Sequence, residues 1–152
     1  MGKQRAVAAL KLDPDWEAEA DEAVHISSFV VSQKGNRILL ARAKDFEGKE
    51  KWFIPGEMLY WGEDPEDGAR RVVAEWFRGV EARPRLREIQ SHTGHAWDLC
   101  FVYEANIPQN AKPASDVSEL KWFPRNKVPL QDMGHEHEDV LATMWAKRAR
   151  PK

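Results

Sequence analysis

The stretch from Lys51 to Val80, KWFIPGEMLYWGEDPEDGARRVVAEWFRGV, limits the fold most strongly because it contains a helix with recognisable ends. Asp64 is a favoured N-cap residue, and Pro65 suits the first helical position, where its missing N–H costs nothing. Arg78 and Gly79 are typical of a last helical turn and the residue that follows it. The apolar residues between these ends recur with helical spacing and form one stripe: Ala69, Val72, Val73, Trp76, Phe77 and Val80. The stretch therefore predicts a short strand, a glycine-containing loop and an amphipathic helix.

The segments on either side predict further strands and a C-terminal helix. A β-hairpin is expected from His25–Gln33 and Arg37–Ala43, joined by a turn at Lys34–Asn36. The other expected elements are strands at Trp52–Ile54, Pro84–Ser91, Asp98–Ile107 and Leu120–Phe123 and a helix at Glu136–Arg148. This order fits an α/β protein in which a mixed β-sheet lies between helices, an α/β/α sandwich.

Length and composition indicate one globular domain. Of the 152 residues, 42% are hydrophobic and 32% are charged, which is typical of a folded soluble protein. We expect a single domain at 23–150, after an N-terminal extension at 1–22 that either packs as a short element or is partly disordered. The only cysteine, Cys100, lies in an apolar run and is expected to be buried.

Charge and hydropathy exclude several classes of partner. The formal net charge of −2 gives no general attraction to nucleic acid. No apolar stretch approaches the length that spans a bilayer, and the N-terminus lacks a signal-peptide pattern. We therefore expect a cytoplasmic protein with no nucleic-acid or membrane partner.

The loop and helix resemble the Nudix box, the signature of the Nudix hydrolases, which is written GX5EX7REUXEEXGU with U an aliphatic residue. Glu63 matches the first glutamate of the motif, and Arg71 matches the arginine. Val73 matches the aliphatic position, and Glu75 matches the first glutamate of the EE pair. The resemblance covers most of residues 25–148 and implies a Nudix-like α/β/α sandwich with a mixed β-sheet.

The same register contains four departures. Glu57 stands at the first glycine, Val72 at the glutamate of RE, Trp76 at the second glutamate of EE, and Gly79 comes one residue late. In the enzymes that the box resembles, glutamates of this helix hold Mg²⁺ or Mn²⁺ against a diphosphate, and the metal activates water. An indole cannot ligate a cation, so Glu75 is the one carboxylate left where the family typically has three. The resemblance thus implies Mg or Mn as cofactor, at a weakened site.

The resemblance makes Glu75, Glu63 and Arg71 the candidate catalytic residues, with Glu75 and Glu63 as metal ligands. Structural roles are open alternatives, because Glu63 can pair with Arg71, and Asp67, Arg71 and Glu75 have the spacing of a charge ladder on a helix surface. Glu57 is a substitute ligand near the loop, although a solvated side chain is the interpretation we favour for it.

Aromatic residues in the stretch are candidates for substrate binding. Trp52, Tyr60 and Trp61 offer surfaces on which a base could stack, whereas packing in the core explains most tryptophans equally well.

Histidines outside the box are candidates for a catalytic base. One Nudix branch, the GDP-mannose mannosyl hydrolases, also lacks the RE glutamate and relies on such a histidine. His92 and His95 lie on an expected turn and are candidates for that role, but we favour the interpretation that both are solvated turn residues. His135 and His137 do not share a helix face, so we interpret them as a polar helix start.

Three functions fit these observations. The favoured one is a divalent-metal-dependent pyrophosphohydrolase that acts on a nucleoside diphosphate linked to another moiety. The second is a catalytically inactive Nudix-fold protein that binds a nucleotide-like small molecule. The third is an interaction domain that binds a protein partner or forms a homodimer. Metal binding together with substrate turnover would identify the first function. Ligand binding without turnover would identify the second, and the absence of both would identify the third.

Overall fold

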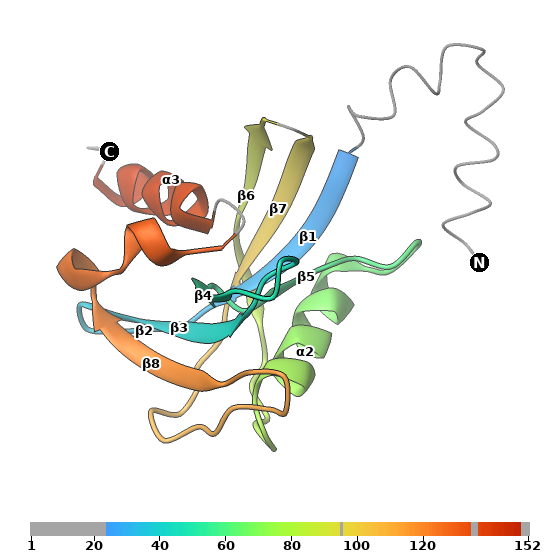
Figure 1. The fold of residues 1–152 in the computed structure, drawn as a ribbon. Helices are drawn as coiled ribbons and strands as arrows, with labels where there is room; N and C mark the ends of the chain where they lie inside the picture. The colour runs from blue at the N-terminus through green and yellow to red at the C-terminus, as the bar shows by residue number, and fades with distance from the viewer. Residues whose placement is uncertain (1–23, 95, 135–136, 150–152) are drawn as a thin grey trace, which may run out of the picture.

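A computed structural model describes residues 24–94, 96–134 and 137–149 (Figure 1). The extension expected at 1–22 lies outside these residues, and so do His95 and His135. None of the helices in the described part of the chain is long and apolar enough to cross a membrane.

Two four-stranded sheets form the centre of the described structure. In the first sheet β1 runs parallel to β7, whereas the outer pairs β1–β5 and β6–β7 are antiparallel, so this sheet is mixed. Its order is β5 (Gly56–Met58), β1 (Val24–Val31), β7 (Trp97–Glu104) and β6 (Arg85–Thr93). The second sheet is antiparallel, with β3 (Arg37–Lys44) beside β2 (Gln33–Lys34), β4 (Glu50–Phe53) and β8 (Glu119–Pro124). Short 3-10 helices follow β8 at Arg125–Lys127 and Leu130–Asp132.

Two helices cover opposite sides of these strands: α2 (Pro65–Trp76) and α3 (His137–Ala149) (Figure 1). Side chains alternate along β1, so Val30 packs in the apolar cluster under α2 while Phe29 and Val31 pack in the cluster that contains the apolar residues of α3. Cys100 is buried in the α3 cluster, as expected, and burial raises the pKa of its thiol to about 12. The expected α/β/α sandwich with a mixed sheet is confirmed.

The expected hairpin pairs differently from the sequence prediction. The residues that pair across the turn with β3 belong to β2, with Gln33 opposite Ile38. The chain changes sheets at Ser32, so that β1 pairs with β5 and β7 instead. The segment Gly56–Met58, expected as loop, is strand β5 because it pairs with the edge of β1. Long-range pairing therefore decides both assignments.

The start of α2 agrees with the sequence prediction. The Asp64 side chain accepts a hydrogen bond from the Glu66 N–H at 2.8 Å, and Pro65 is the first helical residue. Ser28 of β1 donates a hydrogen bond from Oγ to the Pro65 carbonyl oxygen at 2.7 Å, which fastens the helix start to the first sheet.

The end of α2 comes earlier than expected. The helix stops at Trp76, and Phe77 is extended, forming an isolated bridge with Pro113. Arg78 therefore lies beyond the last turn. The physical reason is that Phe77, which is 1% exposed, is anchored in the core against the segment before β8.

We expect Asp64→Ala to lower the free energy of unfolding by about 1 kcal/mol, because the first turn of α2 loses its side-chain acceptor. Asp64→Asn is the matched control, since it keeps an oxygen at the same place and should remain close to the parent. Urea unfolding of the three proteins measures the difference, and equal losses in both variants would contradict a capping role.

Candidate functional site

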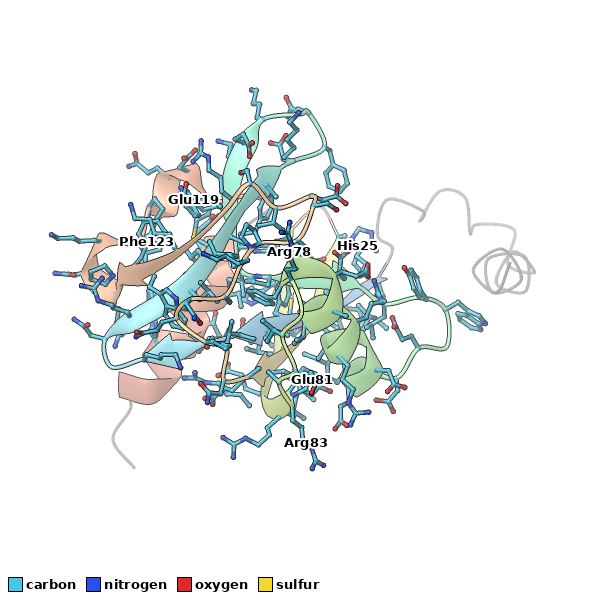
Figure 2. The ribbon with its side chains drawn as sticks, turned by 90° about the horizontal axis from the view of Figure 1, so that it is seen from below. His25, Arg78, Glu81, Arg83, Glu119 and Phe123 are labelled. Atoms are coloured by element: carbon cyan, nitrogen blue, oxygen red, sulfur yellow. The ribbon has the colours of Figure 1, made fainter. Side chains whose placement is uncertain are left out.

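A pocket of about 590 Å³ opens where the first sheet meets α2. Strands β1 and β5 and helix α2 form its walls, and the segments after β3 and before β8 and the start of α3 complete it. His25, near the start of β1 and labelled in Figure 2, is among the residues that line the pocket. Cavities of this size are typical of small-molecule sites, so this pocket is the candidate functional site.

Arg71 joins α2 to the loop that precedes it. Its guanidinium binds both carboxylate oxygens of Glu63, with two contacts of 3.0 Å. Nη2 also donates to the Met58 carbonyl oxygen at 2.9 Å, and Nη1 donates to Glu75 at 3.2 Å. The pairing of Glu63 with Arg71 is thus confirmed, and it fixes the loop on the helix.

The loop itself is shaped around Glu63. The Glu63 N–H donates to the Tyr60 carbonyl oxygen at 2.9 Å, and the Tyr60 N–H donates back to the Glu63 carboxylate at 3.0 Å. Gly62 has a φ of 79°, the left-handed conformation that glycine adopts without strain. The Arg71 hydrogen bond holds the pKa of Glu63 below its ordinary value, and the Glu63 hydrogen bond raises the pKa of Arg71.

Glu75 and Glu57 both reach the pocket, from different elements. Glu75 lies on α2, and its side chain is 47% exposed. Glu57 lies on β5 and is half-buried, and its Oε2 accepts a hydrogen bond from the Trp76 indole N–H at 2.8 Å. This hydrogen bond therefore holds the Glu57 side chain in the pocket wall. Glu57 is not the freely solvated residue that we expected from the sequence.

The two positions at which the box lacks a glutamate have different surroundings. Val72 is fully buried in the core under α2, whereas Trp76 is part of the pocket wall. The ring of Trp76 stands at 68° to that of Phe53, with 6.4 Å between the centroids. The pocket side of α2 thus presents Arg71, Glu75 and an indole.

The donor set decides what kind of cation the pocket suits. Within residues 24–94, 96–134 and 137–149, no group of three or more His, Cys, Asp or Glu side chains is arranged to hold a metal ion. Two carboxylates on one pocket, Glu57 and Glu75, nevertheless match the way Mg²⁺ is usually bound, by one or two carboxylates together with waters and the phosphates of a substrate. The residues fit a cation shared with a phosphorylated ligand, not a closed site made by protein alone.

The pocket is acidic. Its described lining contains five carboxylates, those of Asp45, Glu57, Glu75, Asp98 and Asp116. The permanently charged cations of the lining are Lys44 and Arg71, and the charge of Arg71 is already paired with Glu63. The His25 Nδ1 lies 3.5 Å from the Asp98 Oδ1. Such a pocket attracts cations and accepts a diphosphate favourably only when cations accompany it.

The aromatic residues expected to bind substrate lie in three different environments. Tyr60 lines the pocket, with the Arg71 guanidinium 4.0 Å from its ring centroid. Trp52 is 7% exposed and packs edge-on against Phe123 in the core. Trp61 is 62% exposed and lies outside the described pocket lining. The structure therefore brings Tyr60 to the pocket but not Trp52 or Trp61.

Sequence reasoning missed Phe53 and Phe46. Phe53 lines the pocket because side chains alternate along β4, so the neighbour of a core tryptophan faces the other way. Phe46 is 96% exposed at the pocket, in the charged loop after β3. A single aromatic residue in such a loop was the available sequence signal, since loops often carry binding residues.

The histidines are also placed differently from the sequence interpretation. His92 lines a separate cavity of about 30 Å³, and its Nε2 lies 2.7 Å from the Gln90 side-chain oxygen. His137, interpreted as part of a polar helix start, is 7% exposed and lines both cavities. Its Nδ1 accepts the Ile54 N–H at 2.9 Å, so the proton of the neutral ring is on Nε2. In this form His137 is a donor rather than a base.

We expect Glu63→Gln to lower the free energy of unfolding by about 1 to 2 kcal/mol at neutral pH, because the charge-assisted pairing with Arg71 is lost. The pKa of Glu63 is lowered from 4.5, so the contribution of the carboxylate is complete above that pH and disappears as the pH falls through the folded-state pKa. Denaturant unfolding should show the parent and the variant converging in acid. A difference in the free energy of unfolding between parent and variant that stays constant across this pH range would contradict the assignment.

Comparison with known proteins places this geometry in a family. The family model described as the NUDIX domain matches residues 22–144. A curated ADP-ribose pyrophosphatase of Methanocaldococcus jannaschii is 24% identical over 116 residues, which are 73% of this chain and 67% of that protein.

Solved structures share the fold. The MutT protein of Methanosarcina mazei Go1 aligns with a TM-score of 0.69 at 16% identity, covering 86% of this chain and 99% of that one. The NUDIX domain of Shewanella oneidensis NrtR, solved in complex with ADP ribose, aligns with a TM-score of 0.61 at 18% identity, covering 90% of this chain and 94% of that one. With the family model matching most of its length, the chain belongs to the NUDIX domain family.

Proposed function

We propose that this protein is a Nudix-type pyrophosphohydrolase that acts on a nucleoside diphosphate linked to another moiety, with a divalent cation shared between pocket carboxylates and the substrate's diphosphate. The observation that carries the proposal is the acidic pocket at the box helix, whose described lining contains five carboxylates and an arginine that is already paired with Glu63. A diphosphate enters such a pocket favourably as its complex with Mg²⁺ or Mn²⁺.

Pocket size and family support this class of substrate. A volume of about 590 Å³ lies in the range that encloses most of a small ligand. The curated relative is named an ADP-ribose pyrophosphatase, and the NUDIX domain of Shewanella NrtR was solved with ADP ribose. ADP-ribose is a nucleoside diphosphate linked to a second group, and it is therefore the first substrate to test.

Different residues of the pocket have different proposed roles. Glu75 is the carboxylate of α2 that faces the pocket and is proposed to bind the cation. A divalent cation bound there neutralises charge on the diphosphate and lowers the pKa of a bound water. Glu63 is engaged by Arg71 through both oxygens, so this pair acts by positioning the loop and by orienting Glu75. Tyr60 and Phe53 supply aromatic walls for the organic part of the ligand.

Binding without cleavage is the second candidate function. The observation that favours it is the loss of two box glutamates, one to a buried valine and one to an indole that donates but cannot ligate. The pocket and its ligand class are the same in both proposals. They differ in whether the substrate is turned over, so product analysis separates them.

We expect Mg²⁺ or Mn²⁺ and ADP-ribose together to raise the melting temperature of the protein, because both bind the native state as one complex. Either component alone should give a much smaller shift. Glu75→Gln should remove most of the combined shift, since the amide keeps the size of the side chain but not its charge. Glu66→Gln, on the same helix and outside the described pocket lining, is the matched control and should behave like the parent.

A shift of the same size in excess EDTA would contradict a shared cation. An unchanged shift in Glu75→Gln would remove this residue from the proposed site.

A further inference from the structure

Two of the positions at which this chain departs from the Nudix box contact each other. The Trp76 Nε1–H donates to the Glu57 Oε2 at 2.8 Å across the junction between α2 and β5. The motif has a glutamate at the first of these positions and a glycine at the second. Relative to the motif, a carboxylate is missing from the helix and one has been gained on the facing strand.

We propose that Glu57 is a cation-binding residue of this pocket and replaces the helix carboxylate that Trp76 has displaced. The assignment rests on the proposed function, because the cation is the one shared with the substrate's diphosphate. It names a residue of β5 for a role that the motif gives to α2.

The position of Glu57 supports this role. It is half-buried on β5, pairs with Ser28 of β1, and lines the pocket together with Glu75. Arg71 connects the immediate surroundings of the two carboxylates, since one guanidinium binds both the carbonyl oxygen of Met58, next to Glu57, and the carboxylate of Glu75. Both carboxylates therefore border the same junction of strand and helix.

Trp76 holds Glu57 in place. Its indole N–H donates to one oxygen of the carboxylate, Oε2, and an ionised carboxylate has a second oxygen, Oε1, with which it can ligate a cation. The indole ring is itself fixed by its edge contact with Phe53. Trp76 is thus a positioning residue, which acts on the cation through Glu57.

The chemistry of the ion fits two carboxylates from two elements. Mg²⁺ and Mn²⁺ prefer oxygen ligands, and one or two carboxylates suffice when phosphate oxygens complete the shell. Glu57 and Glu75 provide that number without the remaining box positions. The cation should then bind weakly to the free protein and much better with a diphosphate.

The test is Mn²⁺ binding, measured by electron paramagnetic resonance with α,β-methylene-ADP, a nucleoside diphosphate analogue that resists hydrolysis. Glu57→Gln preserves size and the acceptor for Trp76, and we expect it to weaken Mn²⁺ binding by about tenfold or more, the loss that even a supporting group of a metal site causes. Trp76→Glu in the same background returns a carboxylate to the helix and should recover the binding. Glu66→Gln should match the parent.

The outcomes separate the two proposals. Parent-like Mn²⁺ binding in Glu57→Gln overturns the role of Glu57 and leaves the proposed function standing. Failure of Trp76→Glu to recover binding, in a protein that melts like the parent, overturns the exchange of carboxylates. If the parent itself shows no Mn²⁺ binding that depends on the analogue, the proposed function fails, and this assignment fails with it.

Discussion

The rest of the site depends on the contacts that the Arg71 guanidinium makes. It binds both oxygens of Glu63, the carbonyl oxygen of Met58 and one oxygen of Glu75, and it lies over the ring of Tyr60. One side chain thereby connects strand β5, the loop and helix α2. Because the positive charge of Arg71 is paired with the carboxylates of Glu63 and Glu75, Arg71 organises the pocket without making it basic. This explains how an arginine can stand in the wall of an acidic cavity.

That acidity is the second constraint. A cavity with an excess of carboxylates resists a bare diphosphate, so the diphosphate ligand that we propose would enter together with a cation. The box helix alone is poorly equipped to hold such a charge, because Val72 belongs to the core and Trp76 carries no acceptor. The strand opposite offers Glu57, and the indole holds it there. As proposed above, Glu57 replaces one of the two carboxylates that the helix lacks.

The sequence predicts well what neighbouring residues determine. Asp64 and Pro65 place the start of α2, and the apolar stripe identifies the side of the helix that is buried. It predicts poorly what depends on distant partners. Trp52 and Phe53 are adjacent and both aromatic, yet which one faces the core depends on how β4 pairs with β3. The same holds for β5, which is a strand because the edge of β1 lies beside it.

The pocket itself illustrates this limit. Phe46 and His137 reach it from segments that are far apart in the chain, and no local pattern joins them. Glu57 and Trp76 are nineteen positions apart, and each looks like an isolated departure until their hydrogen bond is seen. The motif register points to the loop and helix beside the pocket, and tertiary packing decides which other residues line that pocket.

We propose that a nucleoside diphosphate derivative is cleaved in this pocket with a divalent cation. The most direct measurement is incubation of the protein with ADP-ribose and Mg²⁺ in ¹⁸O-labelled water, followed by mass spectrometry of the products. We expect cleavage of the diphosphate into two monophosphates, one of which carries the label, and we expect no cleavage in EDTA. Bound but intact ADP-ribose after long incubation would contradict hydrolysis and leave ligand binding as the function of this fold.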